Sequence, residues 1–162
     1  MKKDIFTRRL TSVCLMAAAL ILAAFTVSCN RIETFTDAFI AFDSSKSSAV
    51  SVDAEGEFTG SYTVHYTGPK PAAPISVTFS VTSGDGLEEG IDYRVATPGG
   101  KLTFLPGVYE QTVKIDWLPH DIDQSKDNTV TISLMSADGV TLGYPGPDRL
   151  MKDIVIRKYT LK

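Results

Sequence analysis

The residue whose chemistry and position are most informative is Cys29, a thiol that directly follows an export-signal pattern. Four basic residues near the start of the chain precede an uncharged apolar run over residues 13–27. This order is typical of a signal peptide. The apolar run has about 15 residues, whereas a stable transmembrane helix needs about 20. The small residue Ser28 comes just before the thiol, so the pattern predicts processing next to Cys29.

The end of this segment, Thr26-Val27-Ser28-Cys29, resembles the lipobox of envelope lipoproteins of Gram-negative bacteria. In such proteins the cysteine is lipidated and becomes the mature N-terminus. The resemblance implies a signal peptide over residues 1–28, a lipidated tether over 29–37 and a folded domain over 38–162. It places the protein at the outer membrane, on its surface or its periplasmic face. An ordinary cleaved signal peptide or an uncleaved anchor helix is the alternative.

The remaining composition excludes several kinds of site. Cys14 would leave with the signal and Cys29 would carry the lipid, so disulfides, zinc–thiolate sites and cysteine nucleophiles are not expected. His65 and His120 are too few for a multi-histidine metal site. The formal net charge is −3, and residues 1–28 contribute +3 from four basic residues and one acidic residue, so the rest carries −6. An acidic domain disfavours nucleic acid as a partner.

Known catalytic patterns are missing from the sequence. It contains no Gly-x-Ser-x-Gly elbow, no His-Glu-x-x-His and no glycine-rich phosphate loop. His120-Asp121 would be half of a triad without its serine, and Gly84-Asp85-Gly86 predicts a hairpin turn. The carboxylate pairs Glu88-Glu89 and Asp121/Asp123 are of the type that glycosidases use, but nothing sets their spacing. The sequence therefore argues against an enzyme.

Two aromatic residues are candidates for a sugar-binding platform. Trp117 follows Val113 and Ile115 at intervals of two residues, so the three side chains face the same side of the strand. This predicts a place in the core for Trp117. Tyr144 lies among glycines and prolines, which predicts an exposed loop, and it is the better candidate ligand-binding residue. His65 is expected on the polar face of its strand.

Beyond residue 38, apolar and polar residues alternate with a period of two. The runs are rich in β-branched and aromatic residues and are separated by Gly, Pro and Asp turns, which predicts strands. Their expected positions are 39–42, 49–53, 62–66, 75–81, 102–104, 113–117, 130–134 and 154–156. Seven or eight such strands predict an all-β, two-sheet antiparallel sandwich of immunoglobulin-like size. The basic residues Lys152, Arg157 and Lys158 are expected along a solvated edge.

One block of the sequence is more specific. It consists of Gly90-Ile91-Asp92-Tyr93, Gly100-Lys101-Leu102-Thr103-Phe104, Pro106-Gly107 and Val113-Lys114-Ile115, preceded by the segment over residues 50–56. This order resembles Calx-beta domains, which are sandwich modules of extracellular and membrane-associated proteins, and the resemblance covers residues 39–156. Similar domains of unknown function occur in envelope lipoproteins of polysaccharide-degrading anaerobes.

The resemblance implies a calcium site, because some Calx-beta domains bind Ca²⁺ with carboxylates at one end of the sandwich. The matching positions are Glu55, Asp92, Asp121 and Asp123, with Asp127 as a further candidate. Oxygen ligands from separate loops suit Ca²⁺. However, several acids of the family's pattern are replaced, by Lys126, Asn128, Arg157 and Lys158.

These observations predict a lipid-anchored module of the bacterial envelope that binds a ligand or supports a complex. Its expected partners are the membrane, through the lipid on Cys29, and a glycan or another envelope protein. A Ca²⁺-dependent adhesion module is the alternative, and an enzyme is the third possibility. No cofactor is expected other than the Ca²⁺ of that alternative.

Overall fold

The alternating segments form strands in a computed structural model that describes residues 37–43 and 49–160. The described residues fall within one compact unit, Phe35–Lys162. The strands are β1 (Phe39–Phe42), β2 (Ala49–Asp53), β3 (Phe58–Thr67), β4 (Ile75–Ser83), β5 (Tyr93–Val95), β6 (Lys101–Phe104), β7 (Glu110–Trp117), β8 (Thr129–Ala137), β9 (Thr141–Leu142) and β10 (Asp153–Tyr159), with a 3-10 turn, η1 (Pro98–Gly100). The described segments include no helix long and apolar enough to cross a membrane.

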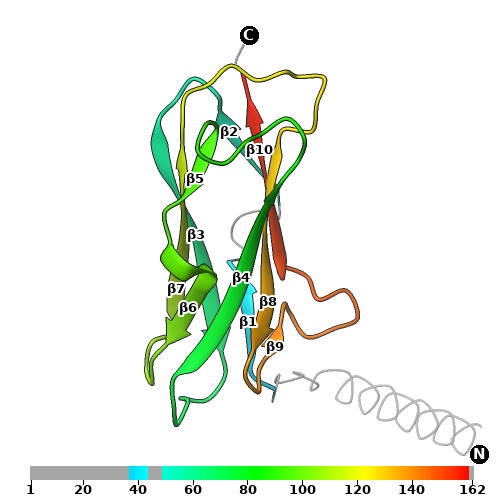
Figure 1. The fold of residues 1–162 in the computed structure, drawn as a ribbon. Helices are drawn as coiled ribbons and strands as arrows, with labels where there is room; N and C mark the ends of the chain where they lie inside the picture. Colours follow the sequence, from blue (N-terminus) through cyan, green and yellow to red (C-terminus); the bar gives the residue numbers. More distant parts are fainter. Residues whose placement is uncertain (1–36, 44–48, 161–162) are drawn as a thin grey trace, which may run out of the picture. The chain divides into compact units, whose positions relative to one another are not determined.

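The strands make two five-stranded sheets packed face to face, as Figure 1 shows. One sheet has the order β5-β7-β3-β1-β9 and the other β2-β10-β8-β4-β6. The predicted all-β, two-sheet sandwich is therefore confirmed. The strand count exceeds the predicted seven or eight because β5 and β9, with three and two residues, are too short to show alternation.

Two strand pairs depart from the predicted antiparallel arrangement. β1 runs parallel to β9, and β2 runs parallel to β10, whereas the other pairings between named strands in the described chain are antiparallel. β1 belongs to one sheet and β2 to the other, so each sheet contains one parallel pair.

The inward faces of both sheets form a single apolar core. Trp117 is fully buried, as predicted, and Tyr93, Leu102 and Phe104 are buried with it. The Trp117 indole N–H donates to the Tyr62 hydroxyl at 3.1 Å, which satisfies the one polar atom of the indole in this core.

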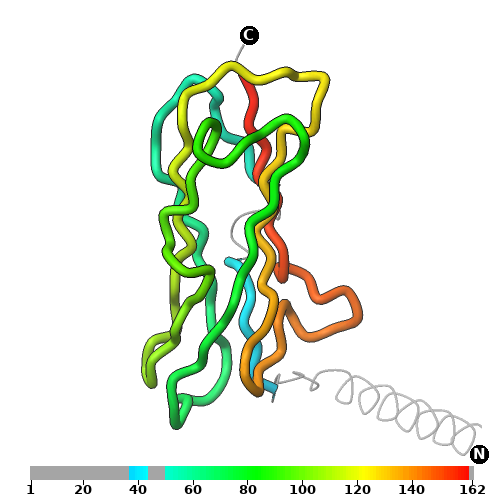
Figure 2. Tube along the Cα trace, in the orientation of Figure 1, coloured from blue at the N-terminus to red at the C-terminus, as the bar shows by residue number. Residues whose placement is uncertain are grey.

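β3 sets the length of the sandwich and separates its two ends. Phe58, at the start of β3, pairs with Trp117, whereas Thr67, at its end, pairs with Phe39. Ten residues at about 3.3 Å each put these ends about 30 Å apart. The chain therefore enters β1 at one end, and the loops after Ser83 and Trp117 lie at the other, as Figures 1 and 2 show.

The segment over residues 84–92 is not the predicted hairpin turn. β4 and β5 lie in different sheets, so this loop crosses from one sheet to the other at the end of the sandwich. Loop 84–92 and loop 118–128 are therefore the elements that build this end.

Candidate functional site

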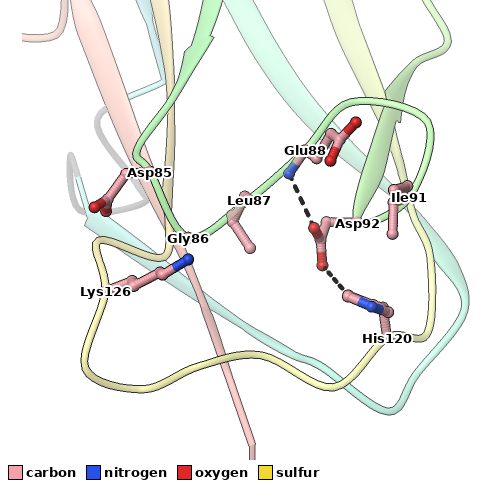
Figure 3. A pocket seen from close by; sticks show the side chains of 8 residues that line it. All are labelled: Asp85, Gly86, Leu87, Glu88, Ile91, Asp92, His120 and Lys126. Atoms are coloured by element: carbon pink, nitrogen blue, oxygen red, sulfur yellow. Dashed lines mark hydrogen bonds and ion pairs between the residues drawn. The ribbon is translucent and has the colours of Figure 1, made fainter.

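Loops 84–92 and 118–128 enclose a hollow of about 330 Å³, here named the loop-end hollow (Figure 3). Acidic, basic, imidazole and apolar side chains line it together. They are Asp85, Leu87, Glu88, Ile91, Asp92, His120 and Lys126, with the backbone of Gly86. Small-molecule sites combine convergent polar groups with apolar surface, and this hollow is a polar example, because five of its eight lining residues have titratable side chains.

The two loops are held together by hydrogen bonds and by a close approach at two glycines. The N–H of Gly86 donates to the carbonyl of Asp127 at 3.0 Å, and the N–H of Asp127 donates to Asp85 Oδ1 at 2.9 Å. A Cβ on Gly84 would collide with the Asp127 carbonyl oxygen, and one on Gly86 would collide with Asn128 Oδ1. The Gly-Asp-Gly sequence is therefore a packing surface for loop 118–128.

We expect Gly86→Ala to destabilise the protein by about 1–3 kcal/mol, the range for overpacking a close contact. The Asn128 side chain cannot easily retreat, because it is buried and its Nδ2 donates to the Asp123 carbonyl at 2.8 Å. Gly56→Ala is the matched control, since a Cβ there lies 3.7 Å from its nearest neighbour, Phe58. Equal urea midpoints for Gly86→Ala and Gly56→Ala would contradict this account.

The polar centre of this end is Asp92, which is buried between the loops just before β5. Its Oδ2 accepts a hydrogen bond from the backbone N–H of Glu88 at 2.9 Å. Its Oδ1 lies 3.0 Å from Lys158 Nζ and 3.0 Å from His120 Nδ1. Three segments of the chain, loop 84–92, loop 118–128 and β10, therefore meet at one carboxylate.

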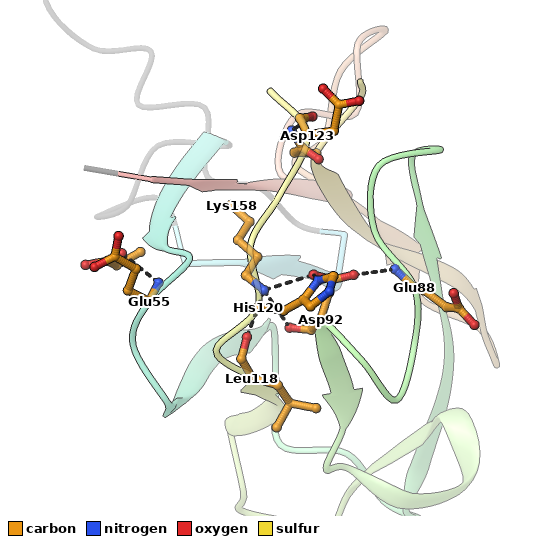
Figure 4. Close-up of polar contacts among 9 residues, drawn as sticks. Glu55, Glu88, Asp92, Leu118, His120, Asp123 and Lys158 are labelled. Atoms are coloured by element: carbon orange, nitrogen blue, oxygen red, sulfur yellow. Dashed lines mark hydrogen bonds and ion pairs between the residues drawn. The ribbon is translucent and has the colours of Figure 1, made fainter. Parts of the chain in front are cut away.

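Lys158 reaches this carboxylate from β10, in the opposite sheet (Figure 4). Its side chain is fully buried, which corrects the prediction that it lies on a solvated edge. Nζ donates to Asp92 Oδ1, to the Leu118 carbonyl at 2.8 Å and to the Asp92 carbonyl at 3.4 Å. Three donors with three acceptors make a satisfied site for a buried ammonium. The neighbouring Arg157 is exposed, as predicted, but β10 lies between β2 and β8, so the predicted edge position is wrong.

Hydrogen bonding keeps the Asp92 carboxyl ionised. Burial raises its pKa, but hydrogen bonds from the Glu88 N–H, Lys158 and His120 outweigh burial and hold the pKa below its usual value. A carboxyl with a lowered folded-state pKa stabilises the fold above its unfolded pKa of about 3.9. That contribution is lost as the pH falls through the lower folded-state pKa.

His120 connects this buried pair to the loop-end hollow. Its side chain is 51% exposed, whereas that of Asp92 is 3% exposed. Because a carboxylate oxygen only accepts hydrogen bonds, Nδ1 of His120 is the donor in this contact. In the neutral ring Nε2 then carries a lone pair and is an acceptor.

The structure does not gather the carboxylates that the sequence analysis named as calcium ligands. Among the described residues, no group of three or more His, Cys, Asp or Glu side chains is placed to hold a metal ion. Glu55 and Asp121 are exposed, and Glu55 and Asp123 lie on loops away from Asp92 (Figure 4). The carboxylate of Asp123 accepts hydrogen bonds from Ser125, which lower its pKa. Of this set, only Asp92 belongs to the loop-end hollow.

The other candidates lie elsewhere. Tyr144 is half-buried, with its ring edge-on to Phe39 at a centroid distance of 5.5 Å. His65, on β3, lies 3.8 Å from Asp43 and 3.5 Å from Glu110 at their nearest N and O atoms. Cys29 lies outside the described residues, and its lipidation stays a prediction.

Sequence reasoning missed Lys158 as a partner of Asp92, although a signal was present. Ile154 and Ile156 point into the core, and a period of two places the next inward side chain at residue 158. The period of two thus indicates a buried side chain at residue 158, whereas the positive charge of Lys158 had suggested an exposed one.

A scan of family models gives no match for this sequence, and neither does a comparison with curated proteins. Among solved structures, the chain is similar to a crystal structure of a protein of unknown function from Bacteroides ovatus, with a TM-score of 0.53 and 12% identity. The match covers 76% of this chain and 47% of that chain, so this chain spans about half the length of that protein. At this identity, the similarity shows the fold alone.

Proposed function

We propose that this chain is a lipid-anchored module of the bacterial envelope that binds a ligand or partner at the loop end of its sandwich, in glycan capture or in the assembly of a larger complex. The lipid would be attached to Cys29, ten positions before the first residue of β1, Phe39. The loop-end hollow would be the binding site.

The observation that carries this proposal is the placement of the hollow relative to the start of β1. Phe39 and Trp117 pair with opposite ends of β3, so the hollow lies about 30 Å from the point where the chain enters the sandwich. The segment that leads to Cys29 therefore joins the sandwich at the end opposite the hollow. The mixed polar and apolar lining supports binding of a small molecule or of a sugar within a longer glycan.

The anchor is tested with Cys29→Ser, for which we expect an unlipidated chain that leaves the membrane fraction. Two acyl chains anchor a protein stably, because each buried methylene contributes about 0.8 kcal/mol. Mass spectrometry of the wild-type protein should show a diacylglycerol thioether on Cys29. Cys14→Ser is the matched control, because it changes the other cysteine of the sequence and should leave lipidation intact. An unmodified N-terminus downstream of Cys29 would reject the anchored module.

A further inference from the structure

We propose that the loop-end hollow binds a single uncharged sugar residue, with a sugar hydroxyl donating to Nε2 of His120. This inference rests on the proposed binding role and names the ligand class of the same site. It follows from three features of the hollow: the fixed acceptor on His120, the mixture of donors and acceptors around it, and the sign of the charge on its rim.

The first feature is the orientation of the His120 ring. Asp92 holds Nδ1 at 3.0 Å, and Lys158 holds the same carboxylate oxygen from the core at 3.0 Å. The buried Asp92–Lys158 pair therefore fixes the orientation of the ring, and Nδ1 is the donor in its contact with Asp92. Nε2 is then the acceptor that the half-exposed ring offers to a ligand in the hollow.

The second feature is the set of charged groups that surround this acceptor. The carboxylates of Asp85 and Glu88 only accept hydrogen bonds, and the ammonium of Lys126 only donates them. A hydroxyl both donates and accepts, so a ring with several neighbouring hydroxyls can satisfy all of these groups at once. Ile91, which is 45% exposed, and Leu87 add apolar surface for the C–H groups of a sugar ring.

The size of the hollow fits one sugar residue. Small-molecule sites usually measure about 300–1,000 Å³, and the volume here, about 330 Å³, lies at the lower end of that range. The rest of a longer glycan would extend into solvent beyond the two loops.

The third feature, charge, selects against acidic sugars. The charge of Asp92 is offset by Lys158, which leaves Asp85 and Glu88 against Lys126 on the rim. A uronate or a sulfated sugar would bring another negative charge next to two carboxylates, which costs binding free energy. The ligand is therefore a neutral sugar.

The test uses the protein isolated from the envelope in detergent and saturation-transfer NMR with a panel of methyl glycosides. The neutral probes are the glucoside, galactoside, mannoside and N-acetylglucosaminide, and the acidic probes are the glucuronide and galacturonide. We expect at least one neutral glycoside to bind and the uronides to bind more weakly. His120→Phe should weaken binding about tenfold, the effect of losing one good hydrogen bond.

His65→Phe is the matched control, because it removes a histidine that also lies near two carboxylates but belongs to the part of β3 far from the loop-end hollow. The affinity of this variant for the glycosides should equal that of the wild type.

The ¹⁵N shifts of His120 report the tautomer independently of any sugar, and we expect a protonated Nδ1 and an unprotonated Nε2. The inference is overturned by an Nε2–H tautomer, by stronger binding of the uronides, by unchanged affinity in His120→Phe, or by no binding of any neutral probe. None of these results bears on the proposed lipid anchor at Cys29, because mass spectrometry tests that anchor separately.

Discussion

Lys158→Met is expected to lower the free energy of unfolding by about 3–5 kcal/mol, the range for breaking a buried ion pair by removing one partner. Methionine keeps most of the side-chain volume, so the loss comes from the charge that stays behind. Asp92 would remain ionised and buried without Lys158, and the Leu118 carbonyl would lose its donor. Urea denaturation followed by tryptophan fluorescence measures the effect, since Trp117 is the one tryptophan of the sequence.

The matched control is Arg157→Met, which removes a neighbouring positive charge on the exposed face of the same strand. Its effect should stay within about 0.5 kcal/mol, as for most surface substitutions. The double variant Asp92→Asn with Lys158→Met should be more stable than Lys158→Met alone, because it leaves no buried charge. Equal losses for Lys158→Met and Arg157→Met would show that the buried pair contributes nothing to stability.

The burial of Lys158 also illustrates what a sequence can reveal about this fold. The apolar run over residues 154–156 was sufficient to predict a strand, and the period of two of a strand accounts for the burial of both Ile154 and Ile156. A buried lysine needs a partner, and the partner, Asp92, lies 66 positions away in the chain. No local pattern specifies such a contact, since it depends on how the two sheets are stacked.

The candidate site shows the same division between local and long-range information. Asp92 was identified through the Gly-x-Asp-Tyr motif, and it does occupy the centre of the loop end. Its chemistry was assigned to calcium because the motif places an acid there, whereas the structure places an ammonium against it. The Gly-Asp-Gly segment was predicted to be a hairpin turn, whereas its glycines let a distant loop, at Asp127 and Asn128, approach closely.

Trp117→Ala is the second substitution with a large expected effect, a loss of about 3–5 kcal/mol in the free energy of unfolding. The indole is fully buried at the end of β7 and packs against the Tyr93 ring at a centroid distance of 6.2 Å. Its removal would also leave the Tyr62 hydroxyl without its indole donor. Burial raises the pKa of Tyr62, so the hydroxyl stays neutral and still needs a hydrogen-bond partner.

Two further variants, one at the same position and one on the surface, serve as comparisons for this loss. Trp117→Phe keeps a six-membered aromatic ring and removes the pyrrole part of the indole with its N–H, so it should cost less than Trp117→Ala. Met135→Ala, at a 58% exposed position on β8, should change stability by no more than about 0.5 kcal/mol. Circular-dichroism melts suit this series, because Trp117→Ala removes the fluorophore.

Since Trp117 directly precedes loop 118–128, its loss should also loosen the wall of the loop-end hollow. A near-wild-type melt for Trp117→Ala would instead mean that the indole is not needed for the core and that its place at this end serves another purpose.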